Sequence, residues 1–403
     1  MTAGAAAERT QAPARALKIF MVAGEHSGDA LGAKLIDALR SHQPHGIMFG
    51  GVGGHEMEAH GFASLFPVED VAVMGALNIL KALPRLRRRV FQTVDAAIAF
   101  APDIVVIIDS PEFTHPIAKR IRKRAPHIPI VDYVSPSVWA WRPGRARKMR
   151  SYVDEILALL PFEPAVHERL GGPHCTYVGH PLIEKLDVIR AADADELRAR
   201  LGIQPGRDVL LVLPGSRRSE MERLIGVFGE AVEELKKSGR DFEVVIPAVA
   251  HLRAEIERHA SAWPVPVHVI EGADKYAAMG MARVALAASG TVTLELALAG
   301  VPMVVGYRID ALSAVVVRRL ITADTAVLPN HILGERAFPE FMQEDCTAGN
   351  LSRALTVLFD DSAARRAQMA AIARVPEKLA LPEGTPSDAA AAATLSVLNR
   401  QAR

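Results

Sequence analysis

Asp109, Glu25 and Ser27 stand where a parallel sheet would display catalytic groups. Asp109 directly follows the apolar run 104–108, and Glu25 and Ser27 follow the apolar run 18–23. If both runs are strands of one sheet, these side chains lie at its carboxyl edge, where ligands bind. A carboxylate in that place suits a general base that takes a proton from a hydroxyl.

The same residues also have a purely structural interpretation. Ser27 or Asp29 can cap the helix after the first run, and Asp109 can cap a helix that starts near Pro116. A second glycine-rich loop, residues 50–54, lacks the G-x-G-x-x-G order and the acidic residue that a dinucleotide site requires. A dinucleotide site is therefore not expected.

Two turns in the second half of the chain are suited to bind an anion. Each follows an apolar run and opens a helical pattern, where backbone N–H groups and the helix dipole attract negative charge. Arg217 adds a fixed positive charge to the first turn. Glu295 lies about one helical turn beyond the second of these anion-binding turns. Its carboxylate repels phosphate but can accept hydrogen bonds from the two vicinal hydroxyls of a ribose. One such turn is commonplace, but two on neighbouring strands favour a nucleoside diphosphate. The residues are Ser216 and Arg217 in the first turn, and Ser289, Gly290, Thr291 and Glu295 in the second.

The sequence predicts no metal site and no cofactor. None of the 14 histidines forms an H-E-x-x-H or similar pair, and neither a D-x-D motif nor a G-x-x-x-x-G-K-[ST] loop occurs. A leaving diphosphate would then be stabilised by the helix ends and by Arg217.

Strand-length apolar runs alternate with helical patterns in both halves, which indicates parallel sheets covered on both faces. The pattern restarts near residue 206 without a sequence repeat. We therefore expect an α/β protein of two doubly wound, Rossmann-like domains. The expected strands are 18–23, 47–49, 104–108, 130–134 and 155–160, then 209–213, 242–246, 267–270, 284–287 and 303–305. The expected division is a disordered lead-in (1–16), a first domain (17–185), a linker (186–205), a second domain (206–365) and C-terminal helices (366–403).

The composition of the chain limits the classes of partner and the cellular locations that are expected. The 47 basic and 46 acidic residues give a formal net charge of +1, which excludes a generic nucleic-acid coat. Trp139 and Trp141 before a basic run are conceivable as a nucleic-acid reader, but a loop that packs one of them is the stronger interpretation. Cys175 and Cys346 fit a reducing cytoplasm. No apolar stretch reaches the roughly 20 residues of a membrane span.

Basic residues gather in the first half of the chain, densely over residues 81–89. Leucines stand among them, and this mixture suits a segment on an anionic bilayer, with apolar side chains inward and arginines at the headgroups. The alternative is a helix that packs Leu86, Val90 and Val94 on the core and exposes a basic face. The arginines concerned are Arg85, Arg87, Arg88 and Arg89.

Eight segments, in this order, resemble the lipid-A-disaccharide synthase family. They are 21–32 (MVAGEHSGDALG), 72–75 (AVMG), 133–142 (YVSPSVWAWR), 160–163 (LPFE), 178–180 (VGH), 213–217 (LPGSR), 288–291 (ASGT) and 302–307 (PMVVGY). No single segment is decisive, but together they are specific. The resemblance implies the B-type glycosyltransferase fold, with two facing Rossmann-like domains and the nucleotide in the second.

The resemblance also implies a reaction. The donor would be UDP-2,3-diacylglucosamine and the acceptor 2,3-diacylglucosamine 1-phosphate, giving a β-1,6-linked lipid A disaccharide phosphate and UDP. Because the donor is α-linked, a β product means one inverting displacement with a base on the acceptor hydroxyl. The implied location is the cytoplasm, in peripheral contact with the inner membrane, and a homodimer is left open.

Several residues match the family's functional positions. The resemblance implies that Asp109 is the base, with Glu25 and Ser27 near it. It places Arg217, Glu295 and Asn330 at the nucleotide. Two departures leave acceptor contacts open, because Glu112 and Thr114 replace a common Asp and Asn. Arg336 is given no role, because the family's Gly-Arg-Glu reads Gly-Glu-Arg here.

Two rival interpretations remain. One is another B-type enzyme acting on UDP-N-acetylglucosamine, either a 2-epimerase or a transferase with soluble substrates. The other is a non-catalytic sensor of nucleotide sugars, against which Asp109 argues because a sensor needs no base.

Overall fold

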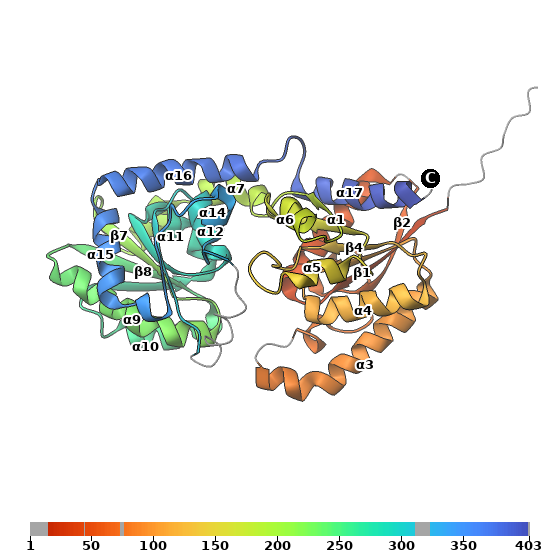
Figure 1. Cartoon of the computed structure of the whole chain (residues 1–403). Helices are drawn as coiled ribbons and strands as arrows, with labels where there is room; N and C mark the ends of the chain where they lie inside the picture. Colours follow the sequence, from red (N-terminus) through yellow and green to blue (C-terminus); the bar gives the residue numbers. More distant parts are fainter. Residues whose placement is uncertain (1–14, 44, 73–75, 311–322, 402–403) are drawn as a thin grey trace, which may run out of the picture.

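The structure consists of two α/β lobes side by side, with the last helices running along one edge of both (Figure 1). It is a computed structural model that describes residues 15–43, 45–72, 76–310 and 323–401. Residues 1–14 of the expected lead-in lie outside the described residues. Each lobe contains one parallel sheet covered by helices, which confirms the predicted fold class.

The first lobe is built on a six-stranded sheet in the order β2-β1-β3-β4-β5-β6. The central strand β3 is apolar and buried throughout, because helices cover both faces. Strand β1 pairs with β2 on one side and with β3 on the other. The strand order therefore reverses between β1 and β3, and these two strands flank the topological switch point. The strands are β1 (Leu17–Ala23), β2 (Ile47–Val52), β3 (Ile104–Ile108), β4 (Ile130–Tyr133), β5 (Glu155–Ala158) and β6 (His174–Tyr177).

Amphipathic helices cover the two faces of this sheet. Leu35 and Leu39 of one helix pack on one face, and Val90, Val94 and Ile117 pack on the other. The helices are α1 (His26–His42), α2 (His55–Ala59), α3 (Ala76–Phe100), α4 (Pro111–Arg124), α5 (Gly144–Met149) and α6 (Glu163–Arg169), with short 3₁₀ turns η1 (Val68–Asp70) and η2 (Ile183–Lys185).

The second lobe has a parallel sheet in the order β12-β11-β10-β7-β8-β9, the strand order typical of dinucleotide-binding domains. Its switch point lies between the paired strands β7 and β10. The strands are β7 (Asp208–Leu213), β8 (Phe242–Ala248), β9 (Val267–Glu271), β10 (Val284–Ala288), β11 (Met303–Tyr307) and β12 (Glu340–Met342).

The helices of the second lobe begin inside the expected linker. Residues 186–205 hold two short helices, whose Ile189 and Leu197 are buried in the core of this lobe. The helices are α7 (Leu186–Ala191), α8 (Ala194–Arg200), α9 (Arg218–Lys237), α10 (Arg253–Ala260), α11 (Lys275–Met281), α12 (Thr291–Leu298) and α14 (Leu328–Leu333), with 3₁₀ turns η3 (Ala250–Leu252), η4 (Gly272–Asp274) and η5 (Gln343–Asp345).

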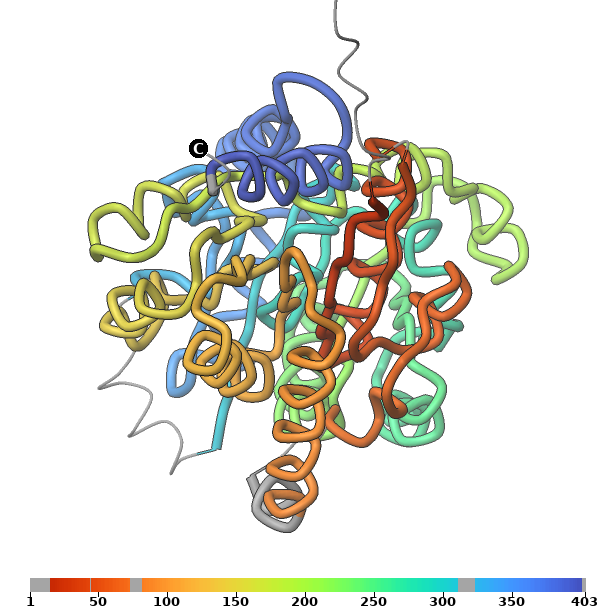
Figure 2. The backbone as a smooth tube through the Cα atoms, turned by 90° about the vertical axis from the view of Figure 1, so that its right-hand side faces the viewer, coloured from red at the N-terminus to blue at the C-terminus, as the bar shows by residue number. Residues whose placement is uncertain are grey.

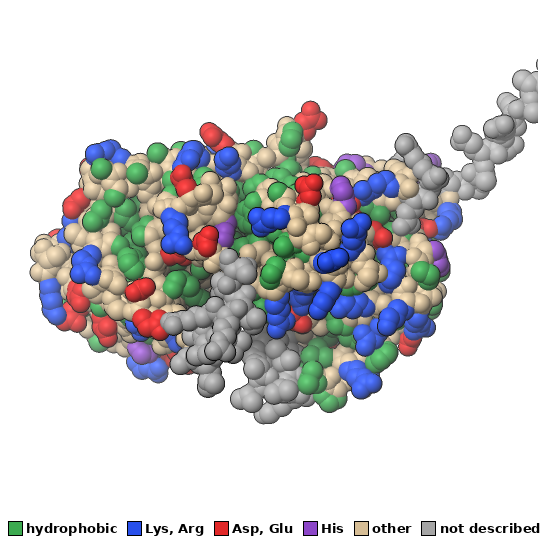
Figure 3. Space-filling view, in the orientation of Figure 1, with side chains coloured by type: hydrophobic (Ala, Val, Ile, Leu, Met, Phe, Trp, Pro, Cys, Tyr) green, Lys and Arg blue, Asp and Glu red, His purple; other side chains and the backbone are tan. Residues whose placement is uncertain are grey.

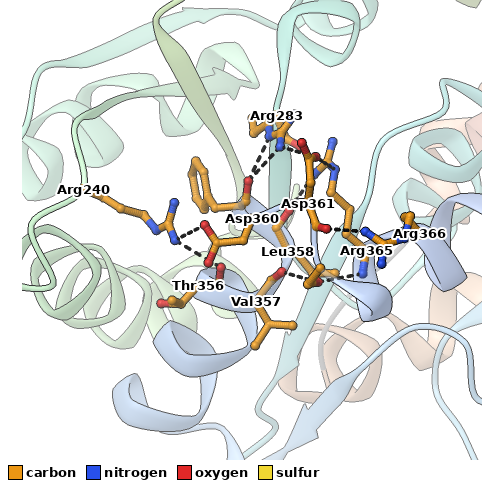
Figure 4. A network of polar contacts seen from close by, with 11 residues as sticks. Arg240, Arg283, Thr356, Val357, Leu358, Asp360, Asp361, Arg365 and Arg366 are labelled. Atoms are coloured by element: carbon orange, nitrogen blue, oxygen red, sulfur yellow. Dashed lines mark hydrogen bonds and ion pairs between the residues drawn. The ribbon is translucent and has the colours of Figure 1, made fainter.

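Arginines clamp the turn between α15 (Ala348–Phe359) and α16 (Ala363–Leu379), as Figure 4 shows. Arg283 donates to the Phe359 carbonyl at 2.9 Å and to Asp361 at 2.8 Å. Arg365 donates to the carbonyls of Leu358 at 2.6 Å and Arg283 at 2.9 Å. These bonds anchor α16 to the second sheet.

The last helix, α17 (Pro386–Gln401), belongs to the first lobe. It lies against α1 and buries Ala390, Ala391 and Val397 in that lobe's core. Arg400 at its end pairs with the buried Glu155 of β5. Figure 2 shows this helix across the top of the view. The chain therefore crosses between the lobes twice.

Asp29 joins the start of α1 to the start of α2. Its buried carboxylate accepts hydrogen bonds from the backbone N–H groups of Gly54 at 2.7 Å, Glu56 at 2.9 Å and Met57 at 3.1 Å. It therefore caps α2 from a neighbouring helix. The cap position of α1 is Glu25, with no side-chain cap, so neither Ser27 nor Asp29 caps the helix that contains them.

We expect Asp29→Ala to lower the free energy of unfolding of the first lobe by about 2–4 kcal/mol, because three N–H groups lose a charged, buried acceptor. Urea titration followed by circular dichroism measures this loss. Asp37→Ala is the matched control, since Asp37 lies on the same helix with 54% of its side chain exposed. Equal losses in both variants would assign the effect to the helix rather than to the cap.

Candidate active site

The switch point of the first sheet brings Ser27 and Asp109 together. The Ser27 hydroxyl donates to Asp109 Oδ2 at 3.2 Å, and the Ser110 N–H donates to Asp109 Oδ1 at 2.7 Å. Asp109 is half-buried and Ser27 is exposed. Helix α4 begins at Pro111, earlier than expected, and its cap residue is Ser110. Asp109 therefore bonds to Ser27 and Ser110 and does not cap the helix.

The backbone around Asp109 is held in a sparsely populated conformation. The φ angles of Asp109, Ser110 and Val134 are +54°, +44° and +84°. Non-glycine residues with positive φ carry strain that clusters at functional sites. The Asp109 N–H donates to the Tyr133 carbonyl at 2.9 Å, so the ladder between β3 and β4 holds the residue in place.

Gly24 sets the close approach of β1 to the start of α4. A Cβ atom at this position would stand 2.6 Å from Ser110 Cβ, a distance that side chains do not tolerate. Only glycine lets the segment with Glu25 and Ser27 lie against the segment with Asp109. Glu25 itself is half-buried at the cap position of α1.

The switch point of the second sheet opens into a pocket of about 410 Å³. The two turns predicted from the sequence form its walls, because β7 and β10 are adjacent. Gly215 has a φ of +110° and Gly290 a φ of +149°, which glycine adopts without strain. Among the lining residues are Ser216, Arg217, Ser289, Gly290, Thr291 and Glu295.

Charged partners that the sequence did not reveal surround this pocket. Lys275 Nζ lies 2.7 and 2.9 Å from the two oxygens of Glu295, and the Tyr276 hydroxyl donates to Glu295 at 3.0 Å. Burial, with the Glu295 charge beside it, raises the pKa of Tyr276 to about 12. Glu220 holds Arg217 at 3.1 Å. The sequence after β9 contains no motif from which Lys275 could have been predicted as a pocket residue.

Asn330 does not line this pocket. Its side chain is 2% exposed, and its amide donates to the Phe338 carbonyl and accepts from the Phe338 N–H, both at 3.0 Å. The segment it holds touches the pocket indirectly, because the Ser289 hydroxyl donates to the Ala326 carbonyl at 2.6 Å. A direct nucleotide contact by Asn330 stays a prediction.

The two departures from the family pattern both have partners near Asp109. Thr114 donates to the Asp109 carbonyl at 2.8 Å, so it supports the backbone that carries the carboxylate. Glu112 pairs with Arg145 at 2.7 Å on the neighbouring helix α5.

Trp139 links the two lobes. Its ring lies 5.3 Å from that of Phe162 and 4.4 Å from that of His331 in the second lobe. The indole N–H donates to the buried Glu163 at 3.2 Å, and burial raises the pKa of Glu163 to about 7. The stronger interpretation of this segment, a loop that packs a tryptophan, is confirmed.

The four arginines of α3 do not share one environment. Arg85, Arg87 and Arg88 are exposed, but the Arg89 side chain is 17% exposed and pairs with Asp70. Its guanidinium also covers the Phe66 ring at 4.4 Å. Arg89 therefore anchors α3 to the lobe, and its place in the predicted membrane surface stays a prediction, as do those of Arg85, Arg87 and Arg88. The side chains of residues 76–81 lie outside what the structure describes.

Within the described residues, no helix is long and apolar enough to cross a membrane. In the same part of the chain, no group of three or more His, Cys, Asp or Glu side chains is placed to hold a metal ion.

Solved structures of the same fold superpose on nearly the whole chain. UDP-GlcNAc 2-epimerase from Neisseria meningitidis, bound to UDP-GlcNAc, superposes with a TM-score of 0.61 at 16% identity over 96% of this chain and 100% of that chain. MurG from Acinetobacter baumannii gives a TM-score of 0.55 at 13% identity over 96% of this chain and 99% of that chain. The protein therefore has the B-type glycosyltransferase fold, with two Rossmann-like domains.

Sequence comparison identifies the family. Residues 19–393 match the family model described as Lipid-A-disaccharide synthetase. The lipid-A-disaccharide synthase of Nitrobacter winogradskyi is 51% identical over 375 residues, 93% of this chain and 94% of the relative. That of Nitrobacter hamburgensis is 48% identical over 383 residues, 95% of this chain and 96% of the relative. The chain belongs to the lipid-A-disaccharide synthase family.

Proposed function

We propose that this enzyme transfers 2,3-diacylglucosamine from its UDP donor to 2,3-diacylglucosamine 1-phosphate, with inversion, in lipid A biosynthesis. Membership of the lipid-A-disaccharide synthase family supports disaccharide synthesis by glycosyl transfer. The observation that carries the mechanism is the contact of Ser27 with Asp109 at the switch point of the first lobe. A carboxylate held there by a hydroxyl suits proton transfer from an acceptor.

In this proposal, Asp109 takes the proton of the acceptor's 6-hydroxyl. The hydroxyl oxygen forms a bond to the anomeric carbon of the donor while the bond from that carbon to UDP breaks. The electron pair leaves with the diphosphate, and the configuration at the anomeric carbon inverts. Ser27 and the Ser110 N–H orient the carboxylate. Glu25 stands at the cap position of α1, two residues before Ser27.

The UDP moiety is assigned to the pocket of the second lobe. The N-termini of α9 and α12, together with Arg217, would stabilise the leaving diphosphate. Lys275 neutralises Glu295 through both carboxylate oxygens. The repulsion of phosphate expected from Glu295 is thereby relieved, and a carboxylate remains for the ribose hydroxyls.

The enzyme is expected to work at the cytoplasmic side of the inner membrane, where its acylated substrates reside. The described part of α3 offers the exposed arginines Arg85, Arg87 and Arg88 and the exposed Leu83. Each basic residue near an anionic surface contributes about 1 kcal/mol, which suffices for reversible docking.

We expect Asp109→Asn to lower kcat by about 10² to 10⁴-fold, because the base is lost. The affinity for UDP, measured by calorimetry, should remain that of wild type. The matched control is Asp95→Asn, an exposed carboxylate on α3. Turnover is measured as disaccharide mass from UDP-2,3-diacylglucosamine and its 1-phosphate acceptor. A variant with more than a tenth of the wild-type kcat would remove Asp109 from the role. Conversion of the UDP-sugar without acceptor would instead indicate an epimerase.

Arg217→Ala and Glu295→Gln should each weaken UDP binding. The loss for Arg217 should be about 1.5–3 kcal/mol per charged hydrogen bond to the diphosphate. Calorimetric titration of UDP measures both. Arg218→Ala serves as the control, since Arg218 is adjacent in sequence and pairs with Glu255. Unchanged affinity in both pocket variants would place the nucleotide elsewhere.

Replacing Arg85, Arg87 and Arg88 by Ser should weaken sedimentation with anionic vesicles at low ionic strength, and high salt should release the wild-type enzyme. A control with Lys237 and Arg258 replaced by Ser removes exposed cations from the second lobe instead. If the triple variant sediments like wild type, the docking surface is not the described part of α3.

A further inference from the structure

A basic pocket lies between α4 and α5 on the first lobe, outside the two sites described above. It has a volume of about 410 Å³, and its lining includes Lys119, Arg142, Arg145, Lys148 and a single carboxylate, Glu112. The two helices lie side by side (Figure 1). Lys and Arg side chains gather on the visible face of this lobe (Figure 3).

This α4–α5 pocket adjoins the proposed base. Its lining begins at Pro111, two residues after Asp109, and continues one turn later with His115. His115 is 3% exposed, and its Nε2 lies 3.1 Å from Oδ2 of Asp132 on β4. Asp132 in turn pairs in register with Ile107 of β3. The pocket and Asp109 therefore share one edge of the sheet.

The cations of the α4–α5 pocket outnumber their partners. Arg145 pairs with Glu112 at 2.7 Å. Within the described residues, no carboxylate lies at ion-pair distance from Lys119, Lys148 or Arg142. Burial, with Arg145 and Lys148 close by, lowers the pKa of Lys119. Clustered like charges of this kind repel one another and attract an anion.

The floor of the pocket is formed by two buried aromatic side chains in contact with each other. The Tyr152 hydroxyl and His115 Nδ1 lie 3.0 Å apart, and Lys119 Nζ stands 4.9 Å from the centre of the Tyr152 ring. Both aromatic side chains are buried. A pocket whose walls are already fixed loses little entropy when it binds a ligand.

We propose that the α4–α5 pocket binds the phosphate monoester of the acceptor sugar, an inference that rests on the proposed function. The acceptor's attacking 6-hydroxyl (through C6) and its 1-phosphate are carried by the two carbons that flank the oxygen of one sugar ring. With the hydroxyl at Asp109, the phosphate must therefore be bound close to that residue, and the lining of the α4–α5 pocket begins two residues after it, at Pro111. Arg145 offers a planar fork for a phosphate, and Lys119 and Lys148 offer point charges. Glu112 holds Arg145 until the phosphate competes for it.

The test measures acceptor affinity without turnover. Asp109→Asn enzyme, saturated with UDP in non-ionic detergent, is titrated with 2,3-diacylglucosamine 1-phosphate and with 2,3-diacylglucosamine lacking the phosphate. In this Asp109→Asn background, Lys119→Met and Lys148→Met are introduced singly and together. Each substitution should weaken binding of the phosphorylated acceptor by about tenfold or more. Binding of the unphosphorylated acceptor and of UDP should change less than threefold. Lys119→Arg should restore most of the affinity.

The control is Lys123→Met, on the same helix but outside the lining of the pocket. Equal weakening of both acceptors, or none, would overturn the proposal. Unchanged acceptor affinity with lost binding to anionic vesicles would assign the pocket to a lipid headgroup instead. Failure of the proposed function has a separate signature, because wild-type enzyme would then form no disaccharide from either acceptor.

Discussion

Both candidate sites depend on one constraint of parallel sheets, namely that every strand delivers its carboxyl end to the same edge. Where the strand order reverses, the two flanking loops leave in opposite directions and open a crevice. In the first lobe β1 and β3 flank that point, which places Ser27 beside Asp109. In the second lobe β7 and β10 flank it, which places two helix N-termini around one pocket. The topology alone therefore explains why residues about 80 positions apart along the chain meet, as the separation of 82 between Ser27 and Asp109 illustrates.

The same topology explains how much the sequence alone could predict. Central strands such as β3 are apolar along their whole length, because both faces are covered, and their bounds could be read directly. The edge strands β6 and β12 escaped notice because they are short, mixed with polar residues and only partly buried. The turns after β1, β3, β7 and β10 could be predicted as sites, since a strand end followed by a helix start is a local signal. Lys275 could not, because only the folded sheet brings the start of α11 to Glu295.

The roles of charged residues could likewise be predicted only in part from the sequence. A basic run in the sequence does not distinguish cations that have partners from those that do not. Arg89 pairs with Asp70 and covers the Phe66 ring, and Arg145 pairs with Glu112. Arg85 and Arg88, on the same helix as Arg89, are exposed. Sequence patterning gives the density of charge, but tertiary pairing decides which charges are left for a ligand or a surface. Surface ion pairs contribute little to the stability of the fold. The cations without an ion-pair partner are therefore the ones that indicate where an anionic ligand or surface can bind.

The proposed catalytic geometry also depends on contacts remote from the reacting atoms. A base in one lobe and a nucleotide pocket in the other can cooperate only if the lobes keep a suitable distance. Trp139 reaches His331 of the second lobe, and the Tyr177 hydroxyl of the first lobe donates to the Leu379 carbonyl of α16 at 2.8 Å. Because α16 packs on the second lobe and α17 on the first, the chain itself joins the lobes a second time. A displacement of about 1 Å between reacting groups can cost 10²-fold in rate. In the proposed mechanism, these small contacts between the lobes therefore influence the rate although they lie away from the reacting atoms.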